Sequence, residues 1–120
     1  MASPKRQRVL AIIATDRTFE RAEYRGREVW QGRCLHCNAY LLVELSGEAI
    51  SRATIEHIIP RVHGGTDAPE NLGLACARCN QGKGMRHDRN FKRDPRVQEM
   101  VERLLQRRRE RWRDPEEVTS

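Results

Sequence analysis

Two pairs of cysteines constrain the fold of this chain more than any other feature of its sequence. Cys34 and Cys37 form the first pair, Cys76 and Cys79 form the second, and two residues separate the members of each pair. This spacing lets two thiolates reach one tetrahedral zinc ion, and four thiolates complete a closed structural site. A redox Cys-x-x-Cys motif and two disulfides are the alternatives, but a redox motif does not require a second pair. We therefore predict a structural zinc ion bound by the four cysteines, with His36, inside the first pair, as a further candidate ligand.

The composition indicates why such a site would matter. Of the 120 residues, 38% are hydrophobic, only 5% are aromatic and 33% are charged. A chain of this length forms one domain, and so few apolar residues leave it a thin core. We therefore predict a single domain over residues 1–120 that gains stability from bound metal.

The charge balance favours a polyanionic partner. Lys and Arg number 23 against 17 Asp and Glu, so the net charge is +6. Nucleic acid fits this balance because neutralised phosphates release condensed counterions, and an anionic membrane surface is the competing interpretation. No apolar run approaches the roughly 20 residues that span a bilayer, and Val9–Ala14 is too short for a secretory signal. We expect a cytoplasmic protein without a membrane segment, since a reducing compartment suits four metal-binding cysteines.

Local signals predict helices at both ends of an α+β fold. Ser3 and Pro4 resemble an N-cap followed by proline at the first helical position, and Asp94 and Pro95 repeat the pattern. The predicted elements are a helix to about Ala14, a hairpin of Phe19–Tyr24 and Arg27–Trp30, strands at Leu41–Leu45 and Ile50–Ile58 around the turn Ser46–Glu48, a loop over Pro60–Asn71, a short apolar segment Leu72–Ala75, a helix from near Cys76 to about Gly84, and a last helix over about 95–113. The last helix carries one apolar stripe at helical spacing, formed by Val97, Met100, Val101, Leu104 and Leu105.

The segment between and around the cysteine pairs carries the residues most indicative of function. It reads Thr54-Ile55-Glu56-His57-Ile58-Ile59-Pro60, then His63-Gly64-Gly65 and Asn71-Leu72, and finally Cys76-Ala77-Arg78-Cys79-Asn80 with Lys83-Gly84. Bracketed by the cysteines, this string resembles the HNH nuclease family over about Cys34 to Gly84, less than half of the chain. The resemblance implies a small ββα-metal core, in which one strand carries Glu56 and His57 and a helix carries Asn80.

The chemistry of phosphodiester hydrolysis asks for these residue types. The reaction needs a base that activates water and a cation that offsets charge on the phosphate. Neutral imidazole suits the base near pH 7, and carboxylate and amide oxygens suit Mg²⁺ or Mn²⁺. By position, the resemblance implies that His57 is the general base and that Glu56 and Asn80 bind the ion. It also implies that Asn71 braces the loop and orients His57.

Two residues depart from the common family pattern. Asn80 stands where many members have histidine, and Glu56 stands where aspartate is commoner. Successive strand residues also point to opposite faces. Glu56 and His57 can therefore share a site only if the strand twists or ends there, and nearby Pro60 favours an ending.

Several basic residues are candidates for contacts with nucleic acid. Lys83 follows Asn80 by three residues and so lies on the same helix face. A run on the last helix, formed by Arg107, Arg108 and Arg109, is predicted to track phosphates, although such runs are usually solvated. The roles of His63, His87 and Trp112 stay open between ligand or base contacts and simple packing.

The sequence therefore favours a metal-dependent endonuclease that hydrolyses DNA, and the family resemblance implies that it leaves 3′-hydroxyl and 5′-phosphate ends. One such site cuts one strand, so we expect a monomer or weak dimer that nicks. The alternatives are a non-catalytic zinc module that binds nucleic acid and a zinc-containing subunit that docks through its last helix. A binding module needs neither a base nor ligands for a second metal, which favours the enzyme.

Overall fold

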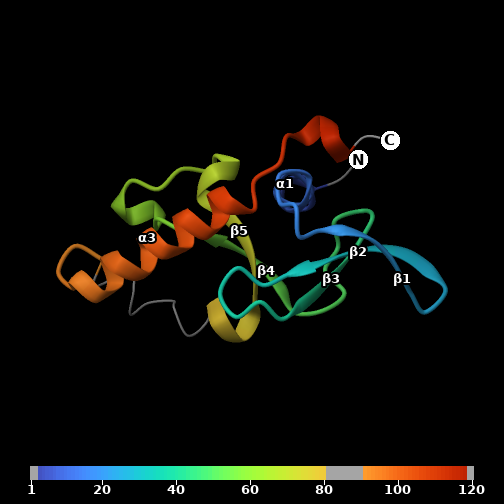
Figure 1. Ribbon diagram of the computed structural model, residues 1–120, viewed down its shortest axis with the longest axis horizontal. Helices are drawn as coiled ribbons and strands as arrows, with labels where there is room; N and C mark the ends of the chain where they lie inside the picture. The colour runs from blue at the N-terminus through green and yellow to red at the C-terminus, as the bar shows by residue number, and fades with distance from the viewer. Residues whose placement is uncertain (1–2, 81–90, 119–120) are drawn as a thin grey trace.

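Helices flank two antiparallel sheets in the computed structural model of this chain, which describes residues 3–80 and 91–118 (Figure 1). The elements in chain order are α1 (Pro4–Ala14), β1 (Glu20–Tyr24), β2 (Arg27–Arg33), β3 (Tyr40–Glu44), β4 (Ala53–His57), the 3-10 turns η1 (Arg61–His63) and η2 (Pro69–Asn71), β5 (Leu72–Cys76), α3 (Pro95–Glu110) and the 3-10 turn η3 (Pro115–Val118). Residues 77–80, directly after β5, are also helical. The predicted α+β class is confirmed. No helix among the described residues is long and apolar enough to cross a membrane.

Both predicted helix starts are confirmed by their caps. The hydroxyl of Ser3 accepts a hydrogen bond from the backbone N–H of Arg6, and the carboxylate of Asp94 accepts one from Arg96. Each cap satisfies an N–H group that has no partner inside the helix. The last helix ends at Glu110, somewhat earlier than predicted.

The three-stranded sheet has the order β1-β2-β3, with every pairing antiparallel. Its first hairpin turns at Arg25 and Gly26, whose φ angles of 51° and 76° are both positive, as a type I′ turn requires. Position 32 in β2 requires glycine, because a Cβ there would lie 2.4 Å from atoms of the Phe19 ring.

The predicted strands on either side of the turn Ser46–Glu48 pair differently from what their order in the sequence suggests. The segments on either side of Ser46–Glu48 do not continue as a hairpin, because β3 pairs with β2 and β4 pairs with β5. Both Ile50 and Ser51 donate their N–H groups to the carbonyl of Leu42, which ends the ladder beside β3. The chain then turns away, and β4 pairs with β5 in a sheet of its own.

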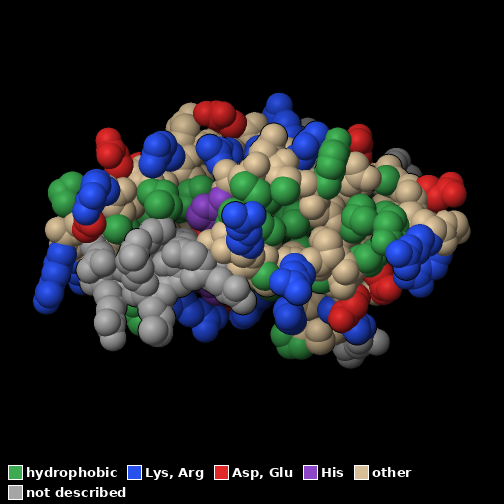
Figure 2. All heavy atoms as spheres, turned by 90° about the horizontal axis from the view of Figure 1, so that it is seen from below, with side chains coloured by type: hydrophobic (Ala, Val, Ile, Leu, Met, Phe, Trp, Pro, Cys, Tyr) green, Lys and Arg blue, Asp and Glu red, His purple; other side chains and the backbone are tan. Residues whose placement is uncertain are grey.

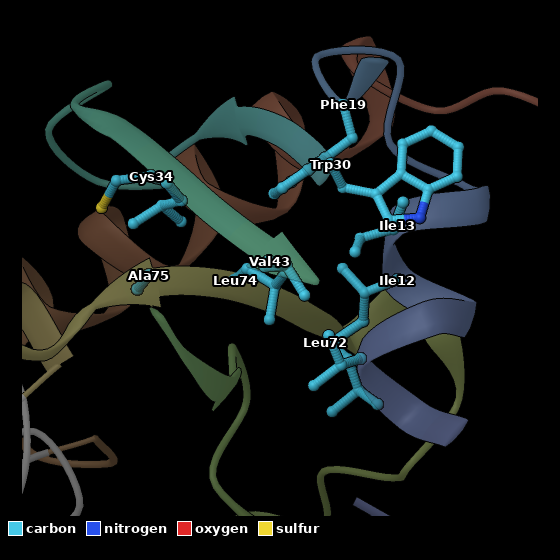
Figure 3. Close-up of a cluster of buried hydrophobic side chains, with 11 residues drawn as sticks. Ile12, Ile13, Phe19, Trp30, Cys34, Val43, Leu72, Leu74 and Ala75 are labelled. Atoms are coloured by element: carbon cyan, nitrogen blue, oxygen red, sulfur yellow. The ribbon is translucent and has the colours of Figure 1, made fainter. Parts of the chain in front are cut away.

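The main core lies between α1 and both sheets. Ile12 and Ile13 of α1 face Trp30 and Val43 of the larger sheet and Leu72 of β5 (Figure 3). Burial of each such side chain contributes about 1.5–3 kcal/mol to stability.

A second cluster lies under the last helix. The apolar stripe of α3 is confirmed, since Val101 and Leu104 pack on Leu35 and Ile58. These two contacts connect α3 to the turn between the first two cysteines and to the residue that follows β4.

Candidate metal centre and active site

The four cysteines converge although 42 positions separate the first from the third. Cys34 and Cys37 lie at the turn that follows β2, Cys76 ends β5, and Cys79 lies in the helical turn after it. Their Sγ atoms all lie within 4.8 Å of one another, and those of Cys37 and Cys76 are 3.9 Å apart. A tetrahedral zinc ion with Zn–S bonds of roughly 2.3 Å places its sulfurs about 3.8 Å apart. The cysteines are thus positioned to bind one metal ion, as their spacing predicted.

The electrostatics of this cluster also fit a bound dication. Burial, followed by contacts with the sulfurs of Cys76 and Cys37, raises the pKa of the Cys79 thiol well above its usual range. Crowded thiolates repel one another, and a zinc ion removes that repulsion by coordinating them. The residues present therefore fit zinc as the structural ion.

Arg107 of α3 and Arg111, directly after it, hold the turn between the first two cysteines in place. Nη1 of Arg107 donates to the carbonyls of Leu35 and His36, at 2.6 and 2.8 Å. Nη1 of Arg111 donates to the carbonyl of Cys34, at 3.3 Å. These guanidiniums bind backbone carbonyls of the protein, so the basic run on α3 owes much of its character to internal packing.

Arg108 corrects the prediction that three consecutive arginines track phosphates. Arg108 is only 1% exposed. Its guanidinium donates to the carbonyls of Thr15, Pro69 and Leu72 and to the Thr15 hydroxyl. Because a buried polar group must be hydrogen-bonded, this guanidinium is committed to the protein and is not available to a phosphate. The Arg108 side chain also lies over the Trp112 ring, 5.1 Å from its centroid, which gives Trp112 a packing role.

The other predicted nucleic-acid contacts have different surroundings. Arg109 lies on the surface, where its Nη2 donates to Oε1 of Gln106 at 2.8 Å. Lys83 and His87 lie outside the described residues. On the face seen in Figure 2, basic side chains are spread over the molecule with acidic ones among them, rather than gathered in one stripe.

Glu56 and His57 turn to different partners at the end of β4. Glu56 is buried, and its two carboxylate oxygens lie 2.7 and 2.5 Å from Nε2 of His36. Nε2 of His57 lies 2.7 Å from Oδ1 of Asp67. β4 ends at His57, yet the alternation of strand side chains still separates the two residues.

Asn80 joins the Glu56 side of the strand. Its amide nitrogen donates to the hydroxyl of Thr54 at 3.0 Å and to the carbonyl of Ile55 at 3.3 Å. Thr54 and Glu56 are two residues apart in β4 and so project from the same face. The two predicted ligands of the catalytic ion therefore lie on one face of β4, and His57 lies on the other.

Sequence reasoning missed Asp67, which is the centre of a charged cluster around His57. The guanidinium of Arg61 contacts both Asp67 oxygens, at 2.8 and 2.6 Å, and Nη2 of Arg8 lies 3.1 Å from Oδ2. The hydrogen bonds from Arg61 and then His57 hold the pKa of the Asp67 carboxyl well below its usual range. The only sequence signal for Asp67 was its place in a loop, where aspartate is common.

Asn71 braces the loop that carries Asp67. Its side-chain oxygen accepts from the N–H of Ile59 at 2.8 Å, and its amide nitrogen donates to the carbonyls of Ile59 and Thr66. Gly65 completes this tight loop, since a Cβ there would lie 1.7 Å from the Ile59 oxygen. His63 stacks on Phe91 with ring centroids 5.0 Å apart, a contact that ties the loop to the segment before α3.

Comparison with known proteins identifies the same part of the chain. Residues 45–96 match the model of a family described as HNH endonuclease, and this range contains the end of β4, the braced loop and Asn80. No curated protein and no solved structure matches the chain. The resemblance predicted from the sequence motif is therefore confirmed over residues 45–96, and this matched range, the HNH endonuclease segment, is slightly less than half of the chain.

Proposed function

We propose that this protein is a metal-dependent endonuclease that hydrolyses DNA phosphodiester bonds at the end of β4. The observation that carries the proposal is the His57–Asp67 pair, which lies inside the HNH endonuclease segment. A histidine held by a carboxylate is the arrangement that general-base catalysis requires.

The pair favours one tautomer of the base. With the Nε2 proton donated to Asp67, the lone pair of the neutral ring lies on Nδ1, which would take a proton from the attacking water. The carboxylate would then stabilise the imidazolium that forms. Because Arg61 and His57 lower the pKa of Asp67, this partner stays ionised across the neutral range.

Glu56 and Asn80 would hold the catalytic ion, Mg²⁺ or Mn²⁺. The amide nitrogen of Asn80 is engaged by Thr54, which leaves the carbonyl oxygen as the end suited to a hard cation. When bound, such an ion stabilises the negative charge that develops on a phosphate during hydrolysis. Because Glu56 and His57 are consecutive, a phosphate lying across the end of β4 could meet residues from both faces.

Charge near the site supports a phosphodiester substrate. Arg8 and Arg61 are both about half exposed and lie beside the proposed base, held there by Asp67. The net charge of +6 adds a long-range attraction to nucleic acid. Arg109, which is exposed, and Lys83 remain proposed phosphate contacts. A single site of this kind would cut one strand per event, so we propose a monomer, or at most a weak dimer, that nicks DNA.

A nicking assay tests the proposal. Zinc-loaded protein is incubated with supercoiled plasmid over a series of Mg²⁺ and Mn²⁺ concentrations, beside an EDTA control. The parent should nick only with added metal, and His57→Ala should be slower by about 10²–10⁴-fold, since that is the usual contribution of a general base. Glu102→Ala, an exposed position on α3, is the matched control and should behave like the parent.

Two outcomes would reject the proposal. A folded, zinc-loaded parent that never nicks with any divalent ion would point instead to the non-catalytic zinc module that binds nucleic acid. Equal rates for the parent and His57→Ala would show that the base lies elsewhere.

A further inference from the structure

We propose that His36 is a third protein ligand of the catalytic ion, beside Glu56 and Asn80. The inference rests on the proposed nuclease function, but it concerns the ligand set of the ion and not the reaction. It assigns His36 away from the structural zinc, which the four cysteines already complete.

The contact with Glu56 is the first argument. Nε2 of His36 lies 2.7 and 2.5 Å from the two oxygens of a carboxylate 20 residues further along the chain. A ring nitrogen that faces both oxygens occupies the edge by which a carboxylate binds a cation. The two side chains are 15% and 1% exposed, so water reaches this carboxylate poorly. Buried charges are paired or coordinate a metal ion, and these two side chains together offer an oxygen donor and a nitrogen donor to one cation.

The position of His36 is fixed by its surroundings. The carbonyls of Leu35 and His36 accept from Arg107, and the N–H of Leu35 donates to the carbonyl of Leu74 at 3.0 Å. The turn also carries Cys34 and so is tied to the zinc site. A side chain held on such a turn is preorganised, as a metal ligand must be.

Asn80 brings a third donor to the same face of β4. Its amide nitrogen binds Thr54, which shares a face with Glu56. An imidazole nitrogen, a carboxylate and an amide oxygen would therefore come from the cysteine turn, the strand and the helical turn after β5. Three protein donors leave the rest of an octahedral ion for water and phosphate.

This ligand set carries a consequence for metal choice. Imidazole binds Mn²⁺ and later transition ions better than Mg²⁺, which prefers oxygen alone. With His36 as a ligand, the site should favour Mn²⁺ over Mg²⁺, and His36→Gln should reduce that preference.

Loss of affinity alone would not prove coordination. A residue that only hydrogen-bonds a metal ligand also changes metal affinity, by about 10–100-fold when it is removed. The test must therefore detect nitrogen bound to the ion. Electron spin-echo envelope modulation of Mn²⁺ does so, because a coordinated imidazole nitrogen modulates the echo.

The experiment uses the full chain with its zinc site filled and one equivalent of Mn²⁺. The parent should show imidazole nitrogen modulation, His36→Ala and His36→Gln should lose it, and the matched control His57→Ala should keep it. Zinc content and thermal unfolding are measured for each variant, and His36→Gln serves where the alanine variant loses its zinc.

The outcomes separate this inference from the nuclease proposal. A parent that binds no Mn²⁺, a parent without nitrogen modulation, or modulation that persists in both His36 variants would each overturn the role of His36. Nicking by such a parent would leave the nuclease proposal standing. Nitrogen-bound Mn²⁺ in a parent that never nicks would support the ligand and reject the nuclease.

Discussion

β4 carries a histidine–carboxylate pair on each of its faces, and the two pairs differ in burial. In the His36–Glu56 pair the side chains are 15% and 1% exposed, whereas in the His57–Asp67 pair they are 24% and 38% exposed. The first pair connects the cysteine turn to the strand, and the second connects the strand to a surface loop. Under the proposed roles, one kind of contact serves two purposes, because the buried pair would hold a cation and the exposed pair would exchange a proton with water.

The partners of the two carboxylates sharpen this contrast. Asp67 receives two guanidiniums, from Arg8 and Arg61, and remains ionised without any metal. Glu56 has the ring of His36 against both its oxygens, in a setting where a full charge is costly. We therefore expect treatments that remove metal to disturb the buried pair and treatments that loosen the loop to disturb the exposed one.

The largest expected effect comes from removing the zinc site, which should abolish both histidine–carboxylate pairs. Structural zinc contributes about 10–16 kcal/mol in small zinc domains, as much as a typical domain's whole stability. Cys76→Ser should therefore lose zinc and cooperative thermal unfolding, both followed by metal analysis and circular dichroism. Ala77→Ser, next in the chain, is the control and should retain both. A metal-free protein as stable as the zinc form would contradict the prediction.

Replacing Arg108 should weaken the fold while leaving both pairs in contact. Arg108→Met removes a donor from the buried carbonyls of Thr15 and Leu72, and losing these charge-assisted hydrogen bonds costs about 3–5 kcal/mol. Urea unfolding measures the loss, and Arg109→Gln, its exposed neighbour, should change stability by less than about 0.5 kcal/mol. Similar losses in the two variants would mean that Arg108 is not committed to the interior.

A substitution with a smaller effect should loosen one histidine–carboxylate pair and leave the other unchanged. Asn71→Ala removes three hydrogen bonds from the loop between Ile59 and Thr66, at a cost of about 1–3 kcal/mol. The His57–Asp67 pair should loosen and nicking should slow by roughly tenfold, since about 1.4 kcal/mol of lost orientation equals that factor. The Mn²⁺ dissociation constant should stay unchanged, because Asn71 does not touch the Glu56 face. A shift in metal affinity as large as the shift in rate would reject this separation.

The smallest effect concerns the pH dependence of stability. The folded pKa of Asp67 is depressed, so its contribution is present above the unfolded pKa of about 3.9 and is lost as the pH falls below that value. Asp67→Asn should therefore have a flatter stability curve than the parent below about pH 4 and a parallel one from pH 5 to 8. Urea midpoints measured from pH 3 to 8 test this. Parallel curves over the whole range would show that the exposed pair adds no pH-dependent stability.

The sequence by itself determined the features that depend on near neighbours in the chain. The starts of α1 and α3 follow from Ser3 and Asp94, because a cap acts on an N–H two or three residues away. The Arg25-Gly26 turn specified its hairpin in the same way. The cysteine cluster was also predictable, since pair spacing reflects the geometry of one metal ion.

Only the tertiary structure decided which groups meet across long stretches of chain. The guanidinium of Arg108 reaches Thr15 across 93 positions, which converts a predicted phosphate contact into an internal hydrogen bond. The sequence places Glu56 beside His57, whereas the fold pairs them with His36 and Asp67. Strand alternation separates neighbours at β4, and the paths of the cysteine turn and the Asp67 loop supply the partners. These paths depend on how the sheets pack against α1 and α3, which no local pattern of residues encodes.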